Sequence, residues 1–276
     1  GALQVQHVGL TPEPPLPEVG ASLARDAIYG RRDVRTAAPR QTPWHATWHE
    51  PGAAYRLWMC TPVDHVEAAN APGQRSLDET GRRVRMLDAV REGESLSSVF
   101  IAVHEPRLPH YAEYIGAVAV LDVAEAGPHA VALRIDRGGD TFYVLHDFAQ
   151  PAHVEGIRFA GEVAVLQMRD GHVRRWMTIA SKQLVAPGVR FEDVQPYATG
   201  PVRIDPADNT VVATAAPRWP VADPEVRVWV RIKSEDRWMG YPVARREGRA
   251  LHIDNYPLPA EAATATLNAV RYGGPE

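Results

Sequence analysis

The sequence predicts an all-β fold, in which a large antiparallel β-sandwich is followed by a small β-module. Short runs of apolar or alternating residues recur along the chain, and turn residues separate them at regular intervals. These runs are rich in β-branched residues, as is typical of two-sheet antiparallel folds. We expect a linker and N-terminal segment over residues 1–28, the sandwich over residues 29–195 and the module over residues 196–276.

The two ends of the chain have the least regular patterns. Residues 9–20 contain many prolines, which lack a backbone donor and fix φ, so we expect an extended linker there. Weak helical character is limited to residues 20–28 and 260–269. Thr and Ala alternate in the second of these segments, so a last strand fits it as well.

The sandwich is expected to consist mostly of short strands joined by tight turns. Glycines at 138–139 and at 171 predict hairpins, because glycine accepts the positive φ that these turns need. The strands that we expect are Ala53–Thr61, Val63–Ala69, Val84–Val90, Ser97–His104, Ile115–Val123, Ala130–Ile135, Thr141–His146, Ile157–Phe159, Val163–Met168, His172–Ile179, Gln183–Val185 and Val202–Ile204.

One strand is expected at the centre of the sandwich. Both alternating sets of side chains in Ser97–His104 are largely apolar, which is typical of a strand that is buried on two sides. We therefore expect Phe100, Ala102 or Val99, and Val118 in the core.

The module contains the clearest alternation in the chain, Val226–Lys233. Val and Ile residues occupy one face of this strand, and Arg227, Trp229 and Arg231 occupy the other. Two further strands are expected at Trp238–Val243 and Ala250–Asp254.

Composition limits the classes of function. Hydrophobic residues make up 45% of the 276 residues and charged residues 23%, as in ordinary globular proteins. The net charge of −4 argues against a general nucleic-acid partner, which needs a basic surface. No apolar run is long enough to span a membrane, and we find no targeting signal. Cys60 is the single cysteine, so no disulfide forms within the chain.

Several short motifs follow one another in a characteristic order. They are PWHATW at Pro43–Trp48, YRLWM at Tyr55–Met59, APGQR at Ala71–Arg75, LSSVFIAVHEP at Leu96–Pro106 and IGAVAVL at Ile115–Leu121. This order resembles the C-terminal β-sandwich region of heparinase II/III-like polysaccharide lyases. The resemblance covers residues 29–123, and the segment Gly200–Asn209 is similar to a hairpin with which those proteins often end.

The resemblance implies a role in a larger protein. In that family the catalytic acid and base lie in an N-terminal helical toroid and at its junction with the sandwich, where a motif H-x-D-x-G-x-F is found. The present sequence lacks that motif. We therefore assign it no catalytic residue, cofactor or metal, and expect it not to be catalytic alone. The implied partners are the toroid of a secreted or periplasmic parent protein and an acidic polysaccharide, either uronate or sulfated.

Tryptophans are the candidate sugar contacts. Trp44, Trp48 and Trp58 form the densest aromatic group, and aromatic rings either stack on sugar rings or fill a core. Trp229 lies between Arg227 and Arg231 on one strand face, which suits an anionic sugar. That face could equally pack against the main sandwich, with Trp229 as a buried anchor.

Two other functions remain open, a free-standing carbohydrate-binding module and a stand-alone polysaccharide-degrading enzyme. Eliminative cleavage of a uronate needs a base and an acid, and histidines and tyrosines surround one loop. Hydrolysis needs two acidic groups in one cleft, but no spacing marks such a pair. The loop residues are His104, His110, Tyr111 and Tyr114, and the acidic candidates are Asp64, Glu67, Glu105 and Glu113.

Two further groups resemble metal ligands only superficially. On a strand, His45 and His49 would lie about 13 Å apart, which is too far for one ion. Asp205, Asp208 and Asn209 supply oxygen atoms that suit calcium, but the same residues are common in a plain hairpin turn, which we favour.

Overall fold

A computed structural model shows that the chain is all-β, as the sequence predicts. The described elements are β-strands and one short 3-10 helix, Ala124–Ala126. The structure describes residues 3–7, 32–39, 42–50, 52–72, 83–110, 114–192, 197–205, 207–213, 227–234, 237–253, 258 and 264–274.

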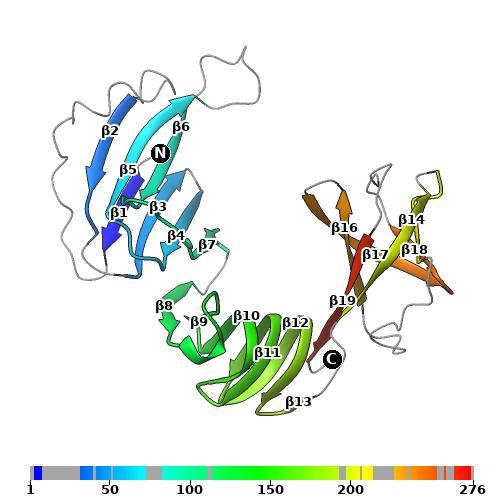
Figure 1. Ribbon diagram of the computed structural model, residues 1–276. Helices are drawn as coiled ribbons and strands as arrows, with labels where there is room; N and C mark the ends of the chain where they lie inside the picture. Colours follow the sequence, from blue (N-terminus) through cyan, green and yellow to red (C-terminus); the bar gives the residue numbers. More distant parts are fainter. Residues whose placement is uncertain are drawn as a thin grey trace. The chain divides into compact units, whose positions relative to one another are not determined.

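The chain divides into two compact units, Gly1–Ala119 and Val120–Glu276 (Figure 1). We describe each unit by itself. The predicted division into residues 1–28, 29–195 and 196–276 stays a prediction, and the predicted linker and weak helix near the N-terminus lie outside the described residues.

The first unit contains two antiparallel sheets. One has the strand order β1–β3–β4–β7, and the other has the order β2–β5–β6. Strand β8 (Ile115–Leu121) follows them and continues into the second unit. The strands of the first sheet are β1 (Leu3–His7), β3 (Trp44–Glu50), β4 (Ala53–Met59) and β7 (Ala102–Arg107). Those of the second are β2 (Arg32–Ala37), β5 (His65–Pro72) and β6 (Arg83–Val90).

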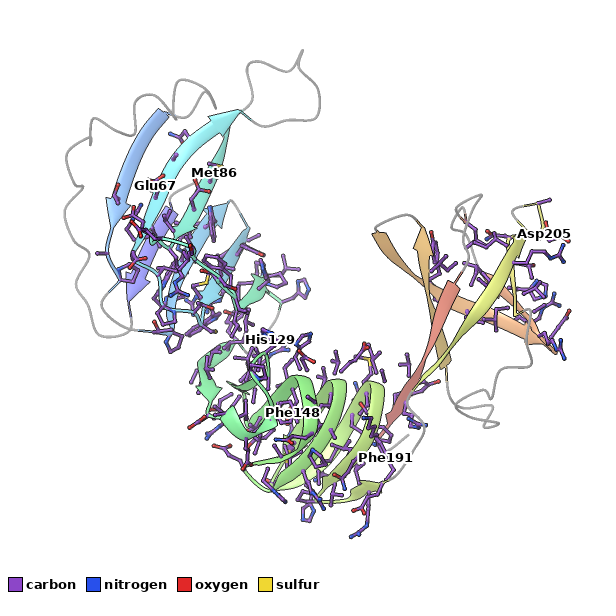
Figure 2. The ribbon with its side chains drawn as sticks, in the orientation of Figure 1. Glu67, Met86, His129, Phe148, Phe191 and Asp205 are labelled. Atoms are coloured by element: carbon purple, nitrogen blue, oxygen red, sulfur yellow. The ribbon has the colours of Figure 1, made fainter. Side chains whose placement is uncertain are left out.

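The core of the first unit lies between these two sheets. Trp44, Ala46 and Met59 come from the first sheet, and Val66 comes from the second. Alternation along β3 explains the selection, because every second residue of Trp44–Glu50 faces the same side. The two sheets therefore pack as a β-sandwich within the first unit, and Figure 2 labels Glu67 and Met86 on its β5 and β6 strands.

The second unit begins with a sheet of long antiparallel strands. Their order is β12–β11–β10–β9, and the short β13 pairs with β12. Both predicted hairpins are present. The φ values are left-handed in both turns, at 55° and 83° for Gly138 and Gly139 and at 52° and 75° for Asp170 and Gly171. The strands are β9 (Val131–Arg137), β10 (Asp140–Val154), β11 (Ile157–Arg169), β12 (His172–Ala186) and β13 (Val189–Phe191).

Bulges make these strands longer than the sequence predicts. The pairs of strands that we expected over 157–168 and over 172–185 are the single strands β11 and β12. The register shifts between Ala160 and Gly161, where β12 has one extra residue opposite β11. Gly161 is required there, because a Cβ atom on it would lie 2.5 Å from the Cα of Ser181.

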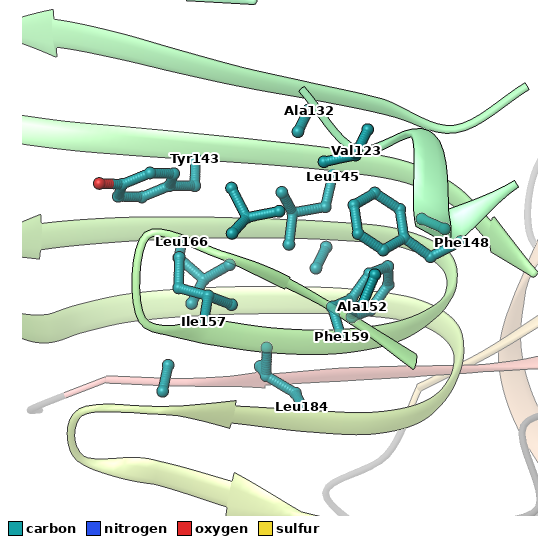
Figure 3. Close-up of a cluster of buried hydrophobic side chains, with 14 residues drawn as sticks. Val123, Ala132, Tyr143, Leu145, Phe148, Ala152, Ile157, Phe159, Leu166 and Leu184 are labelled. Atoms are coloured by element: carbon teal, nitrogen blue, oxygen red, sulfur yellow. The ribbon is translucent and has the colours of Figure 1, made fainter. Parts of the chain in front are cut away.

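Hydrophobic side chains cover one side of this sheet. Leu145 and Phe148 from β10 pack with Ile157, Phe159 and Leu166 from β11 (Figure 3). The rings of Phe148 and Phe159 meet edge to face with centroids 5.3 Å apart. Figure 2 places Phe148 and Phe191 in the same sheet.

The remaining strands form the module. Its core contains Val211, Ile232, Tyr241, Leu251 and Ile253. The last strand pairs with β14, β16 and β12, which confirms the strand alternative for residues 264–269; residues 260–263 lie outside the described part of the chain. The strands are β14 (Tyr197–Asp205), β15 (Thr210–Ala213), β16 (Arg227–Ser234), β17 (Arg237–Glu247), β18 (Ala250–Ile253) and β19 (Thr264–Gly273).

The expected central strand is wrong in its first half. Strand β7 begins only at Ala102, and the side chains of Val99 and Phe100 are 54% and 49% exposed. The reason is that the partner strand β4 ends at Met59, so none of the described strands continues the pairing beside the residues before Ala102. Val118 is buried and Ala102 packs against the core, so those two core positions are confirmed.

Candidate functional site

An aromatic row crosses three neighbouring strands of the first unit. It consists of Trp48 on β3, Tyr55 on β4 and His104 on β7, and we call these three residues the aromatic row. Trp48 lies directly opposite Tyr55 in the register, with ring centroids 5.7 Å apart. The rings of Tyr55 and His104 lie 5.8 Å apart, and the Tyr55 hydroxyl is hydrogen bonded to Nδ1 of His104.

The row begins at the sandwich core and ends at the surface. Trp48 shares a strand face with buried Trp44 and is itself only partly buried against that core. The side chain of Tyr55 is 37% exposed, and His104 is exposed. The sheet therefore exposes two hydrogen-bonded polar aromatic side chains, Tyr55 and His104, next to the partly buried ring of Trp48.

The chemistry of this row suits a ring-shaped polar ligand. The aromatic faces offer apolar area, while the phenol and the imidazole offer hydrogen bonds at its edge. In the tautomer that carries its proton on Nε2, His104 accepts from the Tyr55 hydroxyl through Nδ1 and keeps a donor free for a ligand.

The opposite face of the same sheet carries a polar cluster. Thr47, Arg56 and Glu105 lie in one line across β3, β4 and β7, with Arg107 at a diagonal position. Thr47 and Glu105 are almost fully buried, at 3% and 6% exposure. The Nε atom of Arg56 donates to the Thr47 hydroxyl over 3.2 Å.

Glu105 ties three segments together. One carboxylate oxygen accepts the backbone N–H of Ile115 at 2.6 Å, and the other accepts the indole N–H of Trp58 at 3.3 Å. The Nε atom of Arg56 lies 4.0 Å from the second oxygen. Glu105 thus joins β7 to β4 and to the start of β8, so it braces the sheet.

His45 lies beside this cluster as a neutral ring. Its centroid is 4.8 Å from that of Trp58, and neither of its ring nitrogens has a hydrogen-bond partner. Burial, together with the charges of Arg56 and Arg107, lowers the pKa of His45 to about 4. The face therefore carries positive charge that disfavours another cation.

The tryptophans proposed as sugar contacts lie in different environments. Trp44 has no exposed surface and fills the core, so it takes the core role that the sequence left open. Trp48 lies in the aromatic row. Ile232 is buried in the module core, and by alternation Arg227, Trp229 and Arg231 belong to the other face of β16, but their side chains lie outside the described residues.

Most of the other candidates have structural partners. Asp64 accepts the backbone N–H of Glu92, and Glu67 lies 3.3 Å from His65. The Tyr114 hydroxyl donates to the carbonyl of Leu108. Tyr111 and Glu113 lie outside the described residues, and the structure does not bring His110 into the aromatic row.

The turn that contains Asp205 and Asn209 is the plain Asx-type hairpin turn that we favour over a calcium site. Asp205 accepts the backbone N–H of Ala207, and the Asn209 amide donates to the carbonyl of Ile253. Within the described ranges, no three His, Cys, Asp or Glu side chains are grouped closely enough to hold a metal ion. None of the described helices is long and apolar enough to cross a membrane.

Sequence reasoning missed Tyr55 as a candidate. A signal was available, because a tight connection between Trp44–Glu50 and Ala53–Met59 places Trp48 opposite Tyr55. Comparisons with protein-family models, with curated proteins and with solved structures returned no match.

Proposed function

We propose that this chain is the β-sandwich portion of a heparinase II/III-like polysaccharide lyase. It would support a separate catalytic toroid of a secreted or periplasmic parent protein and contact an acidic polysaccharide. The ordered motifs from Pro43 to Leu121 support the family, and the all-β fold is compatible with it.

The observation that carries the sugar contact is the aromatic row. Exposed Tyr55 and His104, placed on Trp48, combine apolar ring faces with hydrogen-bonding edges. Such a surface binds sugars through stacking and polar contacts together. Because three strands of one sheet position the row, little conformational entropy is lost on binding.

Calorimetric titration with a uronate oligosaccharide tests this contact. We expect the wild type to bind and Tyr55→Ala to lose at least about fivefold in affinity, because removal of a central aromatic contact typically costs more than about 1 kcal/mol. Tyr272→Ala is the matched control, since Tyr272 is a 52% exposed strand tyrosine in the other unit. Equal affinities of the wild type and both variants would reject the aromatic row as the contact.

The hydrogen-bonded Tyr55–His104 pair also keeps the stand-alone enzyme as a second candidate, because a phenol and an imidazole can exchange protons with a substrate. We propose that the chain alone has no such activity. The test is the ultraviolet absorbance of unsaturated uronate products after incubation with heparin, heparan sulfate and alginate. Turnover that disappears in His104→Ala would establish the enzyme instead, whereas binding without turnover fits the sandwich portion or a binding module.

A further inference from the structure

We propose that Arg56 and Arg107 form a binding site for a carboxylate or sulfate group on the face of the β3–β4–β7 sheet that lies opposite the sandwich core. This site lies on the sheet face opposite the aromatic row, and it shares no residue with the row. It therefore stands independently of the proposed function.

The first support is the excess of positive charge. Among the described residues of this cluster, Arg56 and Arg107 face one carboxylate, that of Glu105. Both oxygens of that carboxylate already accept hydrogen bonds from Ile115 and Trp58, and Arg56 approaches it only to 4.0 Å. Charged groups in a partly buried place are normally paired, so within the described part of the chain this cluster lacks one anion.

The second support is the way in which Arg107 is held. Its guanidinium carbon lies 4.0 Å from the centroid of the Tyr114 ring, and the Tyr114 hydroxyl is fixed by a 2.7 Å hydrogen bond to Leu108. The buried Nε of Arg107 has no hydrogen-bond partner. A stacked guanidinium keeps its N–H groups in the plane of the fork, which is the geometry that carboxylate and sulfate groups recognise.

The third support is that Arg56 is positioned without a full salt bridge. Its Nε donates to Thr47, and its guanidinium carbon lies 5.5 Å from the centroid of the Trp58 ring. Arg56 and Arg107 occupy diagonal positions on adjacent strands, where side chains lie roughly 7–8 Å apart. An anion with two or more oxygen atoms can bridge groups at that spacing.

NMR titration of the full chain tests the site with three small probes. These are D-glucuronate, glucose 6-sulfate and uncharged glucose, and the signals to follow are the amides of Arg56, Glu105 and Arg107 and the Arg Nε–H groups. We expect the charged probes to shift these signals, and the effect to weaken as salt rises. The stronger of the two charged probes identifies the group that the site prefers. The absence of any shift, or an equal shift with glucose, would overturn the proposal.

Two substitutions make the test specific. Arg107→Gln should weaken binding at least about tenfold, because it removes a charged fork. Arg190→Gln is the matched control, since Arg190 is an exposed arginine on β13 in the other unit. Should Arg107→Gln fail to fold, Arg107→Lys is the variant to test. Weaker binding by a folded Lys variant supports anion binding by the guanidinium group, and unchanged affinity overturns it. Loss of binding here with retained oligosaccharide binding by the aromatic row, or the reverse, separates the two proposals.

Discussion

The β9–β12 sheet and the β3–β4–β7 sheet differ in what they bury. The core cluster on the first is made of hydrophobic side chains, with Phe148 and Phe159 at its centre. The first sheet also buries polar groups, among them Thr178 and Gln183 on β12. The second gathers the carboxylate of Glu105, the hydroxyl of Thr47 and the partly buried ring of His45 beside two arginines. Burial of polar groups costs free energy unless they are paired, so a sheet that gathers them gives up stability. The difference points to stability as the role of one sheet and to binding as the role of the other.

The largest loss of stability is expected from a change in the hydrophobic cluster of the β9–β12 sheet. Phe159 is fully buried, so Phe159→Ala should lower the free energy of unfolding of its unit by about 3–5 kcal/mol through lost burial and a cavity. Chemical denaturation measures this loss. A decrease below about 1 kcal/mol would mean that this cluster is not the main source of stability.

A smaller effect is expected at Glu105. The variant Glu105→Gln keeps the shape but replaces one acceptor by an amide NH2, which then faces the N–H of either Trp58 or Ile115. We expect a loss of about 1–3 kcal/mol, since one buried donor is left without an acceptor. Unfolding in denaturant, followed by tryptophan fluorescence, would show it. Unchanged stability would contradict the bracing role of Glu105.

His45 makes the stability of the first unit depend on pH. Its pKa of about 4 in the folded state lies below the ordinary value of 6.5, so the unfolded chain binds more protons between these values. The free energy of unfolding should therefore fall as the pH is lowered from 6.5 to 4. Because the ring is only partly buried, we expect a discounted loss of about 1–2 kcal/mol. In His45→Gln this part of the pH dependence should vanish, and an identical profile in both proteins would refute the assignment.

The smallest effect is expected at Phe100. Its side chain is 49% exposed, so Phe100→Ala should change the free energy of unfolding by less than about 0.5 kcal/mol. The same denaturation experiment, run beside Phe159→Ala, contrasts an exposed and a buried phenylalanine. A loss of several kcal/mol at Phe100 would restore the central strand that the sequence predicts.

Much of the fold could be predicted from local sequence patterns, but two kinds of feature could not. The hairpins at Gly139 and Gly171 follow from turn chemistry, and β16 follows from strict alternation. The continuity of β11 through Gly161 was hidden, because a bulge interrupts the alternation that marks a strand. The exposure of Phe100 was hidden because burial depends on where the partner strand β4 ends.

The candidate site could be predicted only in part. The sequence predicts sugar contacts for both Trp44 and Trp48. The two residues are four positions apart on the same face of β3, but Trp44 fills the core instead. Tyr55 and His104 are 49 residues apart in the sequence, and only the register of β4 against β7 brings them together. Long-range pairing of this kind leaves no local pattern to detect.

The central claim is that the first unit, through its aromatic row, contacts acidic polysaccharide. NMR mapping with a uronate oligosaccharide tests it most directly, by recording which signals move during a titration of the full chain. We predict that the side-chain signals of Trp48, Tyr55 and His104 shift together and saturate. Saturating shifts confined to residues of the second unit, with these three unchanged, would contradict the claim.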